Sequence, residues 1–96
     1  MFKSNEHNLK ELINELLKEY KLKDKLKELE IIDTWPKIVG KIIANHTKAI
    51  YLRERKIYVT LDNAAIREEL YYAKTKLLKL INKQLNENYI EEIILK

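Results

Sequence analysis

The stretch TKAIYLRERKIYVTL, residues 47–61, decides the fold of this chain. In residues 47–52 and again in 57–61, β-branched and aromatic residues alternate with the period of two that is typical of strands. The four charged residues between the two runs, 53–56, predict the turn of a β-hairpin. The face of the second strand that we expect to be buried consists of Ile57, Val59 and Leu61.

Ahead of the hairpin the apolar period changes to that of helices, and we expect three of them. The first begins at a cap, Asn5 or Asn8, because a short side-chain oxygen accepts free backbone N–H groups. A second, shorter helix ends near Glu30, and a third begins with Asp33 as its cap and Pro36 in its first turn. Their apolar faces are Leu9, Leu12, Ile13, Leu16, Leu17 and Tyr20; Leu22, Leu26 and Leu29; and Trp35, Ile38, Val39, Ile42 and Ile43.

After the hairpin, Asp62 or Asn63 is expected to cap one long helix that ends at residues 86–88. Residues 89–95 then read as a short returning strand. The expected fold is therefore α+β in the order α-α-α-β-β-α-β, with a three-stranded sheet covered by helices on one face. Residues 1–96 form a single domain, since the chain has no linker or repeat and its length suits one small core.

The composition fits a compact intracellular protein. Of the residues, 46% are hydrophobic and 35% charged, and there is no cysteine, which argues against disorder and against disulfides and favours the cytoplasm. No signal-peptide core or membrane-spanning run is present, so no membrane partner is expected. The net charge of +4 is compatible with a polyanionic partner, although an AT-rich gene would explain the abundant lysines equally well.

The residue inventory argues against catalysis, a metal site or a cofactor. There is no cysteine to act as a nucleophile. The only imidazole bases are His7 and His46, which lie on different predicted elements. The single glycine, Gly40, cannot form a phosphate-binding loop, and in the middle of a helix it is expected to permit close packing. Acidic residues alternate with lysines, as on solvated helix faces. We therefore expect a binding protein and not an enzyme.

Basic residues and one tyrosine form the best candidate site. Four of them cluster on the hairpin and three on the long helix, where cations would neutralise phosphates and a tyrosine ring would stack on an unpaired base. The alternative is that they are ordinary solubilising lysines and a half-buried tyrosine. The predicted nucleic-acid-binding residues are Lys48, Arg53, Arg55, Lys56, Arg67, Tyr71 and Lys74.

An ordered set of short motifs resembles the DciA family. The segments are WPKIVG (35–40), IANHT (43–47), IYVTL (57–61), NAAIREEL (63–70), and further matches at 76–78 and 85–86. Each motif is short and mostly apolar, so the order in which they occur is more specific than any one of them. The signature residues, read as packing positions and not as ligand contacts, are Trp35, Val39, Gly40, His46 and Thr47.

The resemblance implies a KH-like fold and a role in bacterial DNA replication. Proteins similar to this one help to load the replicative hexameric helicase, and they bind single-stranded DNA; RNA is a further candidate ligand. A standard KH domain clamps nucleic acid with a GxxG loop, which this chain cannot form, so its basic hairpin and helix would have to serve instead. Better-known members also carry an extension beyond this domain, and because the sequence stops at Lys96, just after the last predicted strand, we expect a short form with reduced or altered loading activity.

Two other hypotheses use the first helix. Its apolar face, with both Leu16 and Leu17, exceeds what a small core needs. This chain would then be a protein-interaction adapter with no direct nucleic-acid binding, docking that face on a partner such as the helicase. A homodimer through the same face is the remaining alternative. His46, at the junction of helix and strand, is expected to satisfy the last helix carbonyls.

Overall fold

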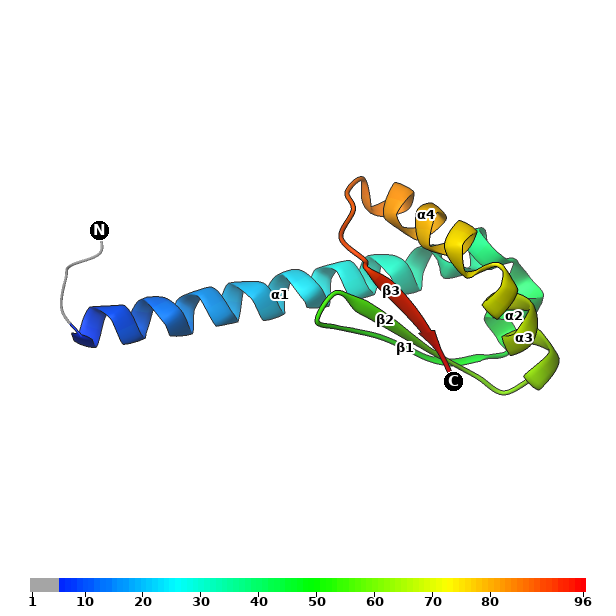
Figure 1. The fold of residues 1–96 in the computed structure, drawn as a ribbon, viewed down its shortest axis with the longest axis horizontal. Coiled ribbons are helices and arrows are strands. Elements are labelled where there is room, and N and C mark those ends of the chain that lie inside the picture. The colour runs from blue at the N-terminus through cyan, green and yellow to red at the C-terminus, as the bar shows by residue number, and fades with distance from the viewer. Residues whose placement is uncertain (1–5) are drawn as a thin grey trace.

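The computed structural model describes residues 6–96, which form an α+β fold of four helices and one three-stranded sheet (Figure 1). The class is as predicted, but the order is α-α-β-β-α-α-β and not α-α-α-β-β-α-β. The elements are α1 (Glu6–Val39), α2 (Lys41–Asn45), β1 (Thr47–Arg53), β2 (Lys56–Leu61), α3 (Ala64–Tyr72), α4 (Lys74–Leu85) and β3 (Glu92–Leu95).

The first helix is one continuous element of 34 residues, so the expected breaks after Tyr20 and at Asp33 are wrong. Between these positions the chain is rich in Leu, Lys and Glu, all strong helix formers, and nothing interrupts the backbone. Pro36 lies inside the helix, where it removes a single hydrogen bond. Asn8 lies within the helix and is not its cap, whereas Asn5 is outside the described residues.

Gly40 separates α1 from α2 through its backbone conformation. Its φ of 93° and ψ of 163° fall in a region that is essentially restricted to glycine. A Cβ added at this position would meet no atom within 4 Å, so the expectation that Gly40 permits close helix packing is wrong. The glycine is needed because it lets the chain turn from α1 into α2.

The predicted long helix is two helices. Asn63 caps the first of them, since its Oδ1 accepts a hydrogen bond of 2.9 Å from the Ile66 N–H. Ala73 then has a non-helical backbone (φ −97°, ψ 11°), which separates α3 from α4. The last strand is shorter than expected and begins at Glu92, because Ile90 is instead held by the side chain of Asn82, which bonds both its N–H and its C=O at 2.9 Å.

The sheet has the order β1-β2-β3, with β2 in the centre. β1 and β2 are antiparallel and are joined by the predicted turn, in which Glu54 and Arg55 both have positive φ, as in a type I′ hairpin. β3 runs parallel to β2, because α3 and α4 carry the chain back to the start of the sheet. The sheet is therefore mixed.

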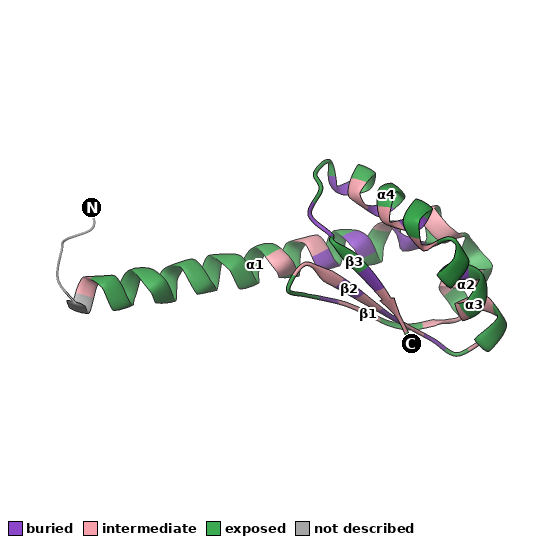
Figure 2. Cartoon of the chain, in the orientation of Figure 1, coloured by how far each residue is buried: buried purple, intermediate pink, exposed green. Residues whose placement is uncertain are grey.

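The core lies on one face of this sheet, as predicted (Figure 2). Ile57, Val59 and Leu61 of β2 are almost fully buried, as the alternation indicated. Trp35 is also buried, and its Nε1 donates a hydrogen bond of 2.9 Å to the Thr47 hydroxyl. The helices add the buried residues Ile31, Leu70, Leu77, Ile81 and Leu85, while Ile42, predicted to be buried, is 74% exposed.

Only the second half of α1 packs on the sheet. There, Glu28 is buried, and one carboxylate oxygen accepts a hydrogen bond of 2.9 Å from the Leu52 N–H at the edge of β1. The Tyr89 hydroxyl donates to Asp24, and burial together with this carboxylate raises the pKa of Tyr89. The first half of α1 projects beyond the sheet (Figure 1). No helix in residues 6–96 is long and apolar enough to cross a membrane.

Candidate nucleic-acid interface

The face of the sheet opposite the core carries aromatic and basic side chains. Strand side chains alternate between faces, so the residues between the buried ones on each strand point to this open face. Cross-strand register places Tyr58 between Tyr51 and Ile94, and Lys56 between Arg53 and Glu92. None of these residues belongs to the hydrophobic core cluster. We call this set, together with Lys96, the open face.

The centre of the open face is a tyrosine pair. The rings of Tyr51 and Tyr58 are stacked with their centroids 4.7 Å apart and an interplanar angle of 6°. Lys96 Nζ lies 5.2 Å from the Tyr58 centroid and 5.9 Å from the Tyr51 centroid, and the Arg53 guanidinium lies 5.8 Å from Tyr51. An aromatic surface edged by cations is what unpaired, phosphate-linked bases require.

Two of the predicted site residues, Arg53 and Lys56, lie on this face at its hairpin end. Lys48 does not join them. It lies at the start of β1, at an irregularity in the pairing, where its Nζ is 3.2 Å from Asp62. His46 Nδ1 is 2.7 Å from the other oxygen of the same carboxylate. The hydrogen bonds with His46 and then Lys48 lower the pKa of Asp62, so the aspartate offsets the charge of Lys48.

The Arg55 side chain bonds the segment before β3 and does not lie on the open face. Its Nε and Nη2 donate hydrogen bonds to the carbonyl oxygens of Tyr89 (2.9 Å) and Asn88 (3.0 Å), and its guanidinium lies 5.2 Å from the Tyr89 ring. The Arg55 carbonyl accepts a further bond of 2.8 Å from Glu91 N–H. These contacts connect the hairpin turn to the segment before β3, so the Arg55 guanidinium has a structural role.

The remaining predicted residues lie around the junction of α3 and α4, separate from the hairpin. Tyr71 is 60% exposed, and Lys74 Nζ lies 5.2 Å from its ring centroid. Tyr72 packs edge-on against Tyr71, with ring centroids 5.9 Å apart. Arg67, on α3, is partly buried, and its Nε has no hydrogen-bond partner among the described residues. The structure thus divides the predicted constellation into two groups.

Sequence reasoning missed Tyr51, Tyr58 and Lys96. The signal for the two tyrosines was present, because a strand that buries Ile57 and Val59 must turn Tyr58 to the other face. The pairing of Tyr51 with Tyr58 follows from the hairpin register once the two-residue turn is known. Nothing local indicated Lys96, which reaches the tyrosines only because β3 pairs with β2.

The signature residues surround the junction between α1 and β1. Val39 is the last residue of α1, and Thr47 accepts from Trp35 and donates to the Ile43 carbonyl at 2.8 Å. The expectation for His46 is met only by its backbone, whose N–H bonds the carbonyls of Ile42 and Ile43. Its ring bonds Asp62 instead.

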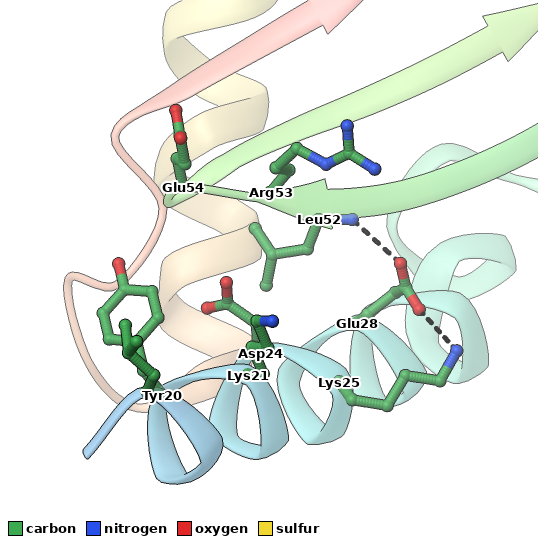
Figure 3. A pocket seen from close by; sticks show the side chains of 9 residues that line it. Tyr20, Lys21, Asp24, Lys25, Glu28, Leu52, Arg53 and Glu54 are labelled. Atoms are coloured by element: carbon green, nitrogen blue, oxygen red, sulfur yellow. Dashed lines mark hydrogen bonds and ion pairs between the residues drawn. The ribbon is translucent and has the colours of Figure 1, made fainter. Parts of the chain in front are cut away.

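A cleft lies on the other side of the hairpin end, between α1 and the tip of β1 (Figure 3). Its wall contains the hydrogen bond from Leu52 to Glu28 and the ion pair of 2.9 Å between Glu28 and Lys25. The lining is mixed in charge and apolar at one end, where Leu17 and Tyr20 contribute. In residues 6–96, no three histidine or acidic side chains come together as a metal site would need.

Comparison with known proteins identifies the family. Residues 8–95 match the family described as Dna[CI] antecedent, DciA. The chain belongs to the DciA family. A UPF0232 protein of Corynebacterium glutamicum (strain R) is 27% identical over 63 residues, which cover 66% of this chain and 35% of that protein. The chain thus spans about a third of the length of this DciA relative. No solved structure matches it.

Proposed function

We propose that this DciA domain is a non-catalytic module of bacterial DNA replication that binds single-stranded nucleic acid on its open face. The observation that supports this is the stacked pair Tyr51–Tyr58 with Arg53 and Lys96 beside it. Membership of the DciA family supports the link with replication. The phosphates would meet Arg53, Lys56 and Lys96, and the bases would stack on the tyrosine pair.

A KH-like fold is part of the same proposal. Its support is the unit β2-α3-α4-β3, in which two helices connect neighbouring parallel strands. KH domains clamp the nucleic-acid backbone with a GxxG loop. Between α3 and α4 this chain has the single residue Ala73 and no glycine. The lack of that loop favours the open face as the place where nucleic acid binds.

The direct test is titration of a labelled single-stranded oligonucleotide at increasing salt. With phosphate contacts at the three cations of the open face, the log–log slope of the binding constant should be about −2. Tyr58→Leu should weaken binding about 5- to 100-fold through lost base stacking. Tyr72→Leu is the matched control, because Tyr72 is 79% exposed on α3 and lies off the sheet. A salt-independent signal, or equal losses in both variants, would contradict the proposal.

Not every predicted basic residue is suitable for testing the contacts with phosphate by charge reversal. Charge reversal at Arg55 would release the segment that it holds, so loss of binding there would be ambiguous. Arg53→Glu and Lys96→Glu change exposed side chains of the open face, and each should reduce the salt slope as well as the affinity. Lys79→Glu, on the exposed surface of α4, is the control of equal charge change.

The same titration separates this function from that of an adapter. We propose the replicative hexameric helicase as the protein partner on the strength of the family alone. If purified helicase binds the domain while oligonucleotides do not, the adapter function replaces the proposed one. If Tyr58→Leu abolishes oligonucleotide binding but leaves helicase binding intact, the two partners use separate surfaces.

A further inference from the structure

The first half of α1 exposes an apolar stripe that no other element of residues 6–96 covers. Six large side chains lie along it, and each is between 37% and 55% exposed. Figures 1 and 2 show this part of the helix extending away from the rest of the domain, exposed along its length. The projecting stripe consists of Leu9, Leu12, Ile13, Leu16, Leu17 and Tyr20.

The projecting stripe continues the side of α1 that packs on the sheet. A spacing of seven residues returns to nearly the same side of a helix. Leu17 is followed at this spacing by Asp24 and then by Ile31, which is only 1% exposed in the core. The side of α1 that carries the projecting stripe therefore continues, past Asp24 and Glu28, into the side that packs in the core, and the domain covers only its second half.

The size of the stripe fits an interface between two copies of this chain. At about half exposure, each of the six residues presents on the order of 100 Å² to water. The patch is then about 600 Å², at the upper limit for a monomer. Two such patches bury on the order of 1,200 Å², the lower limit for a specific interface. We propose that two copies pair their projecting stripes as antiparallel helices.

The antiparallel direction follows from the shape of the domain. Beyond Tyr20, the stripe's side of α1 is occupied by the domain itself, beginning with Asp24 and Glu28. Two helices paired in parallel would bring both domains to the same place between them. In the antiparallel pair each domain lies beyond the other helix's first turn, and the two-fold axis passes between Asn14 and Glu15. Leu9 then lies level with Tyr20 of the partner subunit, and Ile13 with Leu16 of the partner subunit.

The order of charges along the helix favours the same direction. In the antiparallel register, Lys10 is level with Glu19 of the partner subunit, and Lys18 with Glu11 of the partner subunit. A parallel pair in register would place each charge level with its own copy. The chain's net charge of +4 comes from residues 21–96, since residues 1–20 carry one more acidic than basic side chain, and these positive regions would lie at opposite ends of the antiparallel dimer.

The cleft of Figure 3 lies at the end of the projecting stripe that is nearer to the sheet. Leu17 and Tyr20 belong both to the cleft and to the projecting stripe. In the antiparallel register, the first turn of the partner's helix reaches the level of Tyr20 and Lys21 on the cleft wall. The start of the partner's helix would therefore lie beside the end of the cleft that Leu17 and Tyr20 line.

The first test is the molar mass of the intact chain by sedimentation equilibrium between about 1 μM and about 1 mM. A dimer should form within this range, and Ile13→Glu with Leu16→Glu should weaken association at least 100-fold. The matched control is Leu26→Glu with Leu29→Glu, on the other side of the same helix and equally exposed. A monomer at every concentration, or equal losses in both variants, would overturn the proposal.

The second test fixes the direction, because the chain has no cysteine of its own. Mixed Leu9→Cys and Tyr20→Cys proteins should form a disulfide-linked heterodimer, since these positions are level in the antiparallel pair. Leu9→Cys alone should not cross-link, because its two copies are about 16 Å apart along the helix axes. Rapid cross-linking of Leu9→Cys alone would show a parallel pair and contradict the proposed register.

Discussion

The two halves of α1 have the same kind of sequence and opposite surroundings. Both repeat large apolar residues at helical spacing, yet Leu16 is 55% exposed whereas Ile31 is 1% exposed. What differs is position, since only the second half lies where the sheet and α4 can cover it. The comparison teaches that amphipathic periodicity predicts a side that can be buried, and that topology decides what buries it.

The largest expected difference between the two halves is in the free energy of unfolding when one large side chain is truncated in each. Trp35→Ala removes a side chain that is 2% exposed and should lower the free energy of unfolding by about 3–5 kcal/mol. Leu16→Ala should change it by less than about 0.5 kcal/mol in the monomer. Urea denaturation at low protein concentration measures both, and similar losses would mean that the projecting half is covered.

A smaller difference is expected between carboxylates. Glu28→Ala leaves the Leu52 N–H of the edge strand without its partner and should destabilise the domain by about 1–3 kcal/mol. Glu15→Ala, on the exposed projecting half, should have almost no effect. Chemical denaturation of the two variants provides the measurement. If Glu28→Ala were neutral, the contact between α1 and β1 would not stabilise the fold.

A substitution at Gly40 tests whether α1 ends at this residue. Because Gly40 has φ of 93°, Gly40→Ala should destabilise the domain by about 1–2 kcal/mol through backbone strain. If α1 continued as a regular helix through this position, the same change would instead stabilise it by about 1 kcal/mol. The sign of the shift in the thermal midpoint therefore decides between the two, and Lys41→Ala controls for local helix propensity.

The smallest effect is expected at the surface ion pairs of the covered half. Lys27 and Lys23 lie 2.8 Å and 3.5 Å from Glu87, and they lower the pKa of that carboxyl, Lys27 most strongly. A lowered pKa in the folded state contributes stability above the ordinary pKa of glutamate, and this is lost as the pH falls through the folded value.

Glu87→Gln should therefore lower the thermal midpoint slightly at pH 7, and the gap to the wild type should close below about pH 4. Added salt should narrow the gap as well, because Glu87 and Lys23 are exposed to solvent. Thermal melts at three pH values measure the effect. A gap that widens in acid would contradict the assigned cause.

Some of the fold was predictable because its causes are local. The alternation of Ile57, Val59 and Leu61 identified the central strand and its buried face, and Asn63 was correctly among the predicted caps. The breaks in the helices were harder to place. Gly40 and Ala73 interrupt helices through backbone angles that a helical pattern does not reveal, whereas the change of apolar phase at Leu22 suggested an interruption that does not exist.

In the candidate site, too, the local features were predictable and the long-range contacts were not. The basic hairpin residues were apparent as a cluster, but their environments were not, because Arg55 bonds a segment more than thirty residues away. Lys96 reaches the tyrosine pair only because β3 runs parallel to β2, a pairing that depends on the path of α3 and α4. Long-range pairing of this kind cannot be read from a local period.

By itself, then, the sequence determined the α+β class, the presence of the hairpin, the family and the apolar side of α1, since each depends on neighbouring residues or on an ordered motif. Only the tertiary structure decided which half of that side is buried and which face of the sheet stays open. The physical reason is that burial depends on where distant elements come to lie, and here α3, α4 and the second half of α1 cover a single face of the sheet.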